Sequence, residues 1–216
     1  MLEARPPGRS APRRHSRSAP GLTVPSRNDE HVGEPTPGAV DPLAYRAAIG
    51  RFATGVAIVT ALHGERRLAM TANSLTSVSV EPRRILVCFM HDSGTGRAVR
   101  ETRSFALNIL DATHGPELAR RCARKAELDE DQLADVPTSP GPRGLPLIDG
   151  CLEHLVCTVE RTHVVGDHDV VIAAAKPAKQ ARTGSAPLVF YDGGFWHVAD
   201  AEEAGGADAE EAGGAG

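Results

Sequence analysis

The stretch from Leu68 to Val80, LAMTANSLTSVSV, is rich in hydroxyl and amide side chains and carries no charge. It lies between two stretches with the composition of buried strands, although Asn and Ser disfavour strands by up to roughly 1 kcal/mol. A buried polar group without a partner costs about 1–3 kcal/mol. Two explanations are open. The side chains bond to nearby backbone in turns, or they contact a ligand rich in acceptors, such as a heterocycle with a phosphate tail.

A second polar group follows the apolar run ILVCFM, in the segment HDSGTGR at residues 91–97. Ser93, Thr95 and Arg97 stand where a short helix is expected to begin. The N–H groups at the start of a helix favour an anion, but a serine at this place is also an ordinary helix cap. The chain has no GxxxxGK[ST] phosphate loop, so a phosphate would depend on hydroxyls and backbone N–H groups.

Two further residues are candidates for a ligand site. His168 follows the turn in VVGDHDVVIA and begins the returning strand, where it is either a surface residue or part of a site. Asn108, within FALNIL, is either an edge residue bonded to water or a ligand contact. A metal site built on His163 and His168 lacks a third ligand at a supporting spacing, so no metal is predicted. No GxSxG motif is present and no acidic pair stands out, so any catalysis would depend on a cofactor.

Short β-branched and apolar runs separated by turn residues dominate the middle of the chain. Strands are expected near 56–62, 68–70, 74–80, 85–90, 104–110, 151–165 and 170–179, with a closing hairpin at 186–199. Helices are expected at 41–55, where Asp41 caps the start and Gly55 ends it, at 94–102 and at 114–126. Residues 127–150, rich in Pro and Gly, are interpreted as a surface loop or lid. The pattern predicts a mainly β fold, an antiparallel barrel with a few peripheral helices.

Length and composition favour one domain. Of the 216 residues, 41% are hydrophobic and 24% charged, and the net charge is -4, which gives no reason to expect nucleic acid or a membrane as partner. Residues 1–40 are predicted to be a disordered leader, 41–200 the domain, and 201–216 a disordered acidic tail. The N-terminus lacks the apolar segment of a secretory signal, and the apolar runs are too short to span a membrane, so a cytoplasmic protein is predicted.

The four cysteines match no zinc-binding pattern. Cys88 and Cys157 lie in apolar runs, where cysteine acts as a small hydrophobe. Inert thiols in a reducing compartment are the expected state. A disulfide between Cys151 and Cys157 is the alternative.

Several ordered segments resemble the flavin reductase-like family, whose fold is the FMN-binding split barrel. They are GRFATGVAIVTA, MTANSLTSVSVEPRRILVCFM, FALNIL, LPLIDGCLEHLVCTV, GDHDVVIA and PLVFYDGGFW, and together they cover about residues 43–198. The resemblance implies a homodimer that binds FMN or FAD in a groove near the subunit interface. It also implies that NADH or NADPH passes a hydride to the flavin, and that reduced flavin leaves for a partner oxygenase.

The resemblance further implies roles for individual residues. Thr71, Ala72, Asn73 and Ser74 would line the flavin ring, largely through backbone groups. A second set would lie towards the ribityl chain and phosphate: Ser77, Ser93 and Thr95. His168 would lie close to the nicotinamide or the flavin ring, and Asn108 would be a further flavin contact. This chain has Asp92 where the family usually has a basic residue, so Arg97 or His91 would neutralise the phosphate.

An NAD(P)H-dependent flavin reductase that serves a monooxygenase is therefore the leading hypothesis. A non-enzymatic flavin-binding protein on the same fold is the alternative from another class, and an oxidase of a phosphorylated small molecule is a third. Consumption of NAD(P)H with bleaching of free flavin would distinguish the first from the other two.

Overall fold

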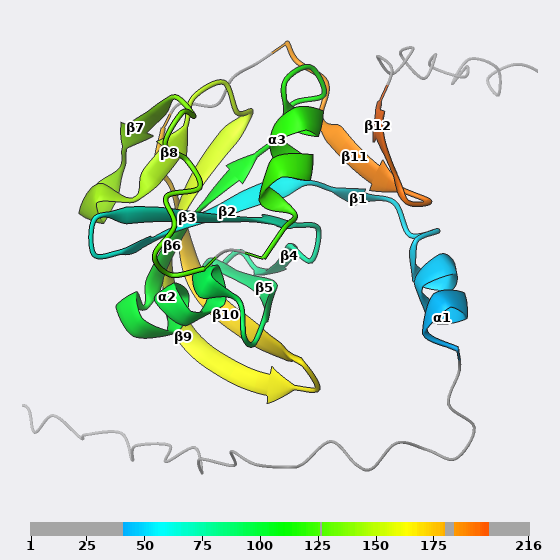
Figure 1. The fold of residues 1–216 in the computed structure, drawn as a ribbon, viewed down its shortest axis with the longest axis horizontal. Coiled ribbons are helices and arrows are strands. Elements are labelled where there is room, and N and C mark those ends of the chain that lie inside the picture. Colours follow the sequence, from blue (N-terminus) through cyan, green and yellow to red (C-terminus); the bar gives the residue numbers. More distant parts are fainter. Residues whose placement is uncertain (1–40, 126, 180–183, 199–216) are drawn as a thin grey trace, which may run out of the picture. The chain divides into compact units, whose positions relative to one another are not determined.

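The computed structural model describes residues 41–125, 127–179 and 184–198. The predicted N-terminal leader and the predicted acidic tail lie outside these residues. A seven-stranded sheet forms the centre of the fold, in the order β3-β2-β6-β9-β10-β5-β4 (Figure 1). Its strands are β2 (Ala57–His63), β3 (Arg66–Ala72), β4 (Thr76–Ser79), β5 (Arg84–Met90), β6 (Ser104–Ile109), β9 (Glu153–Val165) and β10 (His168–Pro177). Every neighbouring pair is antiparallel.

The smaller elements surround this sheet. A three-stranded sheet has the order β1-β11-β12, and β7 pairs with β8. These strands are β1 (Thr54–Gly55), β7 (Thr138–Pro140), β8 (Pro146–Ile148), β11 (Leu188–Tyr191) and β12 (Gly194–His197). The helices are α1 (Pro42–Ile49), α2 (Gly94–Thr102), α3 (Gly115–Cys122) and the short 3-10 helix η1 (Pro142–Gly144). The predicted mainly β, antiparallel split-barrel architecture with a few helices is confirmed, although β3 and β4 remain the open edges of the large sheet.

The alternation of buried and partly exposed residues along the strands produces the core. In β5 the residues Ile85, Val87 and Phe89 are buried while those between them are partly exposed, which is the period of two that a half-buried strand requires. Phe89 meets Phe105 of β6 edge to face, with ring centroids 5.7 Å apart. This pair and the aliphatic side chains of β2 belong to one hydrophobic cluster.

The predicted end of the first helix is wrong. The first helix begins as expected, with the Asp41 carboxylate accepting from the Leu43 N–H, but it ends at Ile49 and Gly50 caps it. Thr54 and Gly55 instead pair with β11. The sequence signal failed because the Gly50 carbonyl accepts from the Asp192 N–H, a contact from the far end of the chain that fixes the exit from the helix.

Residues 127–150 are also not the surface loop or lid that their Pro and Gly content predicts. Leu133, Leu145 and Leu147 are buried, and the segment contains both β7 and β8. It adds apolar side chains to two clusters of the core. The leucines compensate for the ordering cost of the irregular backbone, because each side chain taken out of water contributes about 1.5–3 kcal/mol.

The four cysteines are free thiols, so the alternative of a disulfide between Cys151 and Cys157 is not realised. Within the described ranges, no helix has the length and apolar character needed to cross a membrane.

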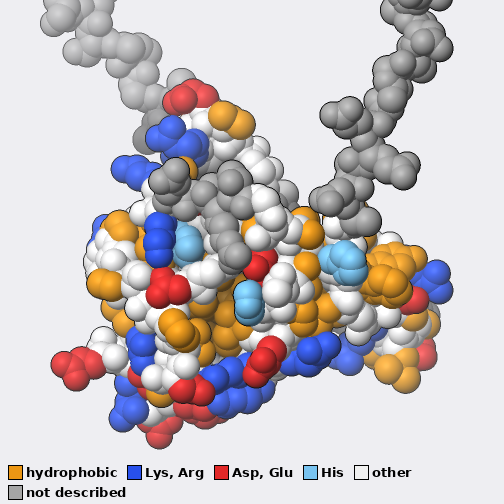
Figure 2. All heavy atoms as spheres, turned by 90° about the horizontal axis from the view of Figure 1, so that it is seen from above, with side chains coloured by type: hydrophobic (Ala, Val, Ile, Leu, Met, Phe, Trp, Pro, Cys, Tyr) orange, Lys and Arg blue, Asp and Glu red, His pale blue; other side chains and the backbone are white. Residues whose placement is uncertain are grey.

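Helix α1 presents apolar side chains to the surface. It buries none of its residues, and Leu43, Tyr45, Ile49 and the following Phe52 are 55–71% exposed. Trp196 of β12 is 57% exposed as well. Figure 2 shows apolar side chains gathered at the right of the view, the side on which Figure 1 draws α1 and β12. Large exposed apolar groups of this kind are typical of an interaction surface.

Candidate functional site

A cleft of about 270 Å³ lies between the large sheet and the chain that follows α3. We call its two sides the strand wall and the helix wall. The strand wall consists of Met70, Thr71, Ala72, Asn73, Ser74, Cys88, Met90, Ser93, Thr95 and His168. The helix wall consists of Cys122, Ala123, Arg124 and Lys125. The volume is just below the roughly 300–1,000 Å³ of sites that enclose a drug-sized ligand, so the cleft suits a planar ring better than a whole dinucleotide.

Side chains of the strand wall mostly bond within the protein. The Thr71 hydroxyl donates to the Ala119 carbonyl of α3 at 2.6 Å. The Ser74 hydroxyl accepts from the Cys88 N–H at 3.0 Å and lies 3.4 Å from the Cys88 carbonyl, which it contacts as a donor. Both hydroxyls therefore hold the 71–75 segment against its neighbours. The surface left for a ligand is backbone together with the exposed Asn73.

The start of α2 contributes the most informative group in the cleft. Ser93 caps the helix, because its hydroxyl accepts from the Gly96 N–H at 3.0 Å and donates to the Met90 carbonyl at 2.8 Å. The Thr95 hydroxyl is different. Its residue is 0% exposed, and its oxygen has no hydrogen-bond partner among the described residues. A buried hydroxyl in this state costs about 1–3 kcal/mol, so a ligand is the expected partner.

The backbone at this helix start is closely packed. A Cβ on Gly96 would lie 2.8 Å from the Ser93 oxygen and 2.9 Å from the Met90 carbonyl oxygen, so a larger residue does not fit. The nine-residue helix α2 directs its first N–H groups towards the same end. An unpartnered hydroxyl beside a helix N-terminus suits a phosphate, so the residues present fit a phosphorylated ligand.

His168 reaches the cleft through strand register. It pairs with Met90 in β5, which places it at the end of β10 beside the start of α2. The turn before it has Gly166 at a φ of +59°, a conformation that glycine adopts readily. The His168 Nδ1 lies 2.7 Å from an Asp167 carboxylate oxygen, and this hydrogen bond lowers the pKa of Asp167 below its usual value. The contact orients the imidazole.

Asp169, next to His168, is buried behind the strand wall. Its side chain is 1% exposed, forms an ion pair with Arg100 of α2 and is hydrogen-bonded to His91, whose Nδ1 lies 2.8 Å away. The carboxylate therefore joins β10 to both ends of the segment that carries Ser93 and Thr95. The predicted use of His91 or Arg97 for a ligand phosphate receives no support, because neither residue lines the cleft.

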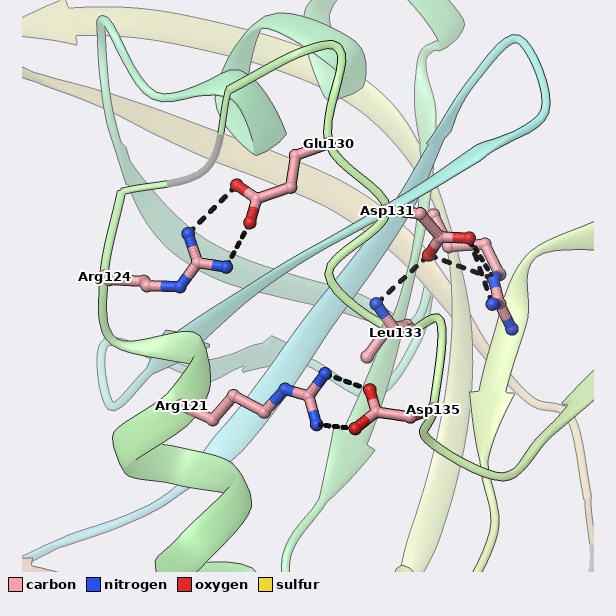
Figure 3. Close-up of polar contacts among 7 residues, drawn as sticks. Arg121, Arg124, Glu130, Asp131, Leu133 and Asp135 are labelled. Carbon is pink, nitrogen blue, oxygen red and sulfur yellow. Dashed lines mark hydrogen bonds and ion pairs between the residues drawn. The ribbon is translucent and has the colours of Figure 1, made fainter.

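Two cations that sequence reasoning missed line the helix wall. The Arg124 guanidinium binds both carboxylate oxygens of Glu130 (Figure 3), and the Lys125 Nζ lies 2.7 Å from the Asp92 carboxylate. The segment RCARKA contains the signal, since its basic residues continue past the last apolar helix position. The helix was expected to continue to residue 126. The helix ends at Cys122, and the chain then follows the cleft.

The structure does not bring two predicted flavin contacts into the cleft. Asn108 is fully buried in β6, where its amide donates to the Ile58 carbonyl at 3.0 Å and accepts from the Ile148 N–H at 2.8 Å. These bonds hold β8 against the large sheet. Ser77 is exposed on the edge strand β4, opposite Ile85 of β5, and does not line the cleft.

The chemistry of the cleft is that of a binding surface. Its described lining contains one imidazole and no carboxylate. Burial raises the pKa of Cys122 to about 11 and also raises the pKa of Cys88, so both remain weakly nucleophilic thiols at neutral pH. A reaction that requires no side-chain acid or nucleophile, such as hydride transfer between two bound rings, suits this lining.

Comparison with known proteins shows the family of this chain. Residues 49–199 match the model of the flavin reductase like domain. The NADH-dependent flavin reductase of a Rhodococcus species is 36% identical over 169 residues, which are 77% of this chain and 91% of that protein. The reductase subunit HsaB of a flavin-dependent monooxygenase from Rhodococcus jostii is 31% identical over 155 residues, covering 72% and 77%.

A solved structure shares the fold. It is the NADH:FAD oxidoreductase SgcE6 of Streptomyces globisporus C-1027 in complex with NAD and FAD fragments, with a TM-score of 0.68 and 31% identity. The match covers 76% of this chain and 99% of that one. The chain therefore belongs to the flavin reductase-like family.

Proposed function

We propose that the cleft binds the ring of FMN or FAD against the strand wall and that the nicotinamide of NADH or NADPH stacks on the exposed side of that ring. The activity, NAD(P)H-dependent reduction of flavin, follows from membership of the family. The observation that carries the placement is the Thr95 hydroxyl, buried and without a protein partner at the start of α2. It lies at one end of an uncharged polar wall long enough to contact a ring.

Each part of the strand wall has a role in this proposal. Backbone groups of residues 71–74 and the Asn73 amide bond to the polar edge of the ring, since Thr71 and Ser74 use their hydroxyls within the protein. The Thr95 hydroxyl and the first N–H groups of α2 bind the phosphate. Ser93 shapes this end by capping the helix rather than by direct contact.

His168 positions the nicotinamide in our proposal. Asp167 orients its imidazole, and the strand register places it beside Met90 at the opening of the cleft. Bound flavin supplies the hydride acceptor, and the protein's contribution is to hold the two reacting atoms about 3–3.5 Å apart. Donors along the ring edge then stabilise the negative charge that develops there.

A partner oxygenase and a second copy of this chain complete the proposal. HsaB is named as the reductase subunit of a flavin-dependent monooxygenase, so we propose that reduced flavin leaves this cleft for an oxygenase. The exposed apolar side chains of α1 support a homodimer, because burying them removes a large apolar area from water. The cytoplasmic location remains a prediction.

Steady-state assays test this function. Purified protein is mixed with NADH or NADPH and with FMN or FAD, and both the nicotinamide and the flavin absorbance are followed. We expect many turnovers with at least one of the four combinations. Tight flavin binding without oxidation of either nicotinamide would instead indicate a non-enzymatic flavin carrier. Failure to bind any flavin would refute the proposal.

A further inference from the structure

Asp92, which is 68% exposed and lies beside the cleft rather than in its lining, forms an ion pair with Lys125 of the helix wall. Asp92 lies in the turn between β5 and α2, directly before the helix-capping Ser93. Lys125 lies beyond the end of α3 on the helix wall. Its Nζ is 2.7 Å from the Asp92 carboxylate, although the two residues are 33 positions apart in sequence. The pair therefore joins two segments on either side of the place where a phosphate would bind.

An acidic residue at this place disfavours the binding of a phosphate. The start of α2 offers N–H groups and the unpartnered Thr95 hydroxyl, and both attract an anion. Asp92 adds a negative charge one residue before the cap. Lys125 lowers the pKa of this carboxyl through a hydrogen bond and through its charge, so Asp92 stays ionised at neutral pH. The same contact occupies the ammonium group that an incoming phosphate would need.

The second cation of the helix wall is less available. Arg124 binds both carboxylate oxygens of Glu130, and paired bonds of this kind fix a guanidinium in one orientation. Lys125 has a single carboxylate contact at the end of a flexible stem. Among the described residues of the cleft, Lys125 is therefore the cation best able to change partners.

We propose that Asp92 competes with the flavin phosphate for Lys125 and so limits how tightly the protein holds phosphorylated flavin. Without flavin, Lys125 pairs with Asp92. A phosphate monoester carries about 1.5 to 2 negative charges at pH 7, so it outcompetes the carboxylate when flavin binds. The exchange leaves Asp92 unpaired and repelling the phosphate. This inference rests on the proposed function, and it explains how the cleft can release reduced flavin to another protein.

Comparing FMN with riboflavin tests the proposal, because the two ligands differ in the phosphate alone. Dissociation constants are measured by quenching of flavin fluorescence at low ionic strength for the unmodified chain and for Asp92→Asn. We expect the constant for FMN to fall by about three- to fivefold, in line with the energies of exposed charge pairs, and that for riboflavin to stay the same. In Lys125→Met, FMN should bind more weakly than in the unmodified chain. Adding Asp92→Asn to Lys125→Met should increase FMN affinity by less than it does in the unmodified chain.

Asp135→Asn is the matched control, since it makes the same change of charge in an exposed ion pair whose cation, Arg121, does not line the cleft, whereas Lys125 does. It should leave both constants unchanged. Equal constants for FMN in Asp92→Asn and the unmodified chain would overturn the competition while riboflavin binding and turnover still support the proposed function. A parallel change for riboflavin would also overturn it. A chain that binds neither FMN nor riboflavin overturns the competition, and it overturns the proposed function as well if FAD is not bound.

Discussion

The two walls of the cleft are held in place by different forces. The strand wall depends on strand register, on backbone hydrogen bonds and on the buried carboxylate of Asp169, which is 1% exposed. The helix wall depends on ion pairs at the surface, such as Arg124 with Glu130, whose side chains are 54% and 32% exposed. Exposed pairs contribute about 0–1 kcal/mol. The strand wall is therefore suited to holding a ring in a fixed position. The helix wall is suited to exchanging its ion-pair partners as a ligand enters and leaves.

The largest expected effect comes from removing the carboxylate behind the strand wall. Asp169→Ala leaves Arg100 and His91 without their shared partner. Breaking a buried pair in this way should lower the free energy of unfolding by about 3 kcal/mol, measured by urea denaturation. Asp135→Ala, which breaks the exposed ion pair with Arg121 beside the helix wall, should change it far less. Similar losses in the two variants would remove the distinction between the walls.

Thr95→Val should separate binding from stability. Valine keeps the shape of threonine and removes a buried hydroxyl that has no described partner, so the free energy of unfolding should stay constant or rise. FMN affinity should fall by about tenfold, the loss expected for one hydrogen bond to a charged group, while riboflavin affinity holds.

A control for this variant lies on the same helix. The Thr102 hydroxyl donates to the Ala98 carbonyl at 2.8 Å, and Thr102 does not line the cleft. Thr102→Val should therefore leave FMN affinity unchanged. If Thr95→Val destabilised the fold without affecting FMN, the hydroxyl would be structural.

His168→Ala tests whether the strand wall also positions the second ring. We expect kcat/KM for the nicotinamide to fall by about tenfold, because a displaced ring reacts more slowly, with a smaller change in flavin affinity. Stopped-flow reduction of bound flavin measures the step directly. His163→Ala, an exposed histidine on the neighbouring strand β9, is the control. Equal losses in nicotinamide turnover and flavin affinity would refute the positioning role.

The fold was largely predictable from local patterns, and the errors in that prediction have a common cause. Alternation and turn residues predicted the long strands β9 and β10, the closing hairpin and helix α2. Residues 127–150 were misjudged because Pro and Gly signal irregular backbone but say nothing about burial. Leu133 and Leu145 enter the core through contacts with strands far away in the chain. A single-sequence pattern carries no information on such contacts.

The site was predictable in outline and not in detail. The uncharged polar row at 71–74 and His168 do line one cleft. Ser93 and Thr95 looked equivalent in sequence, but one hydroxyl caps the helix and the other has no described partner. Arg124 and Lys125 were missed because their position depends on where α3 ends. Asn108 was misassigned because an amide inside a strand can equally well bond to neighbouring backbone.

The smallest expected effect concerns Glu130, which holds Arg124 on the helix wall. Glu130→Gln should release part of the guanidinium and increase FMN affinity by about twofold at low salt, as expected for an exposed ion pair. In 1 M salt, where the screening length is about 3 Å, the gain should vanish. Titrations at both ionic strengths measure it, with riboflavin as the uncharged reference. A salt-independent change would mean that Glu130 shapes the cleft through packing, and the helix wall would then be as rigid as the strand wall.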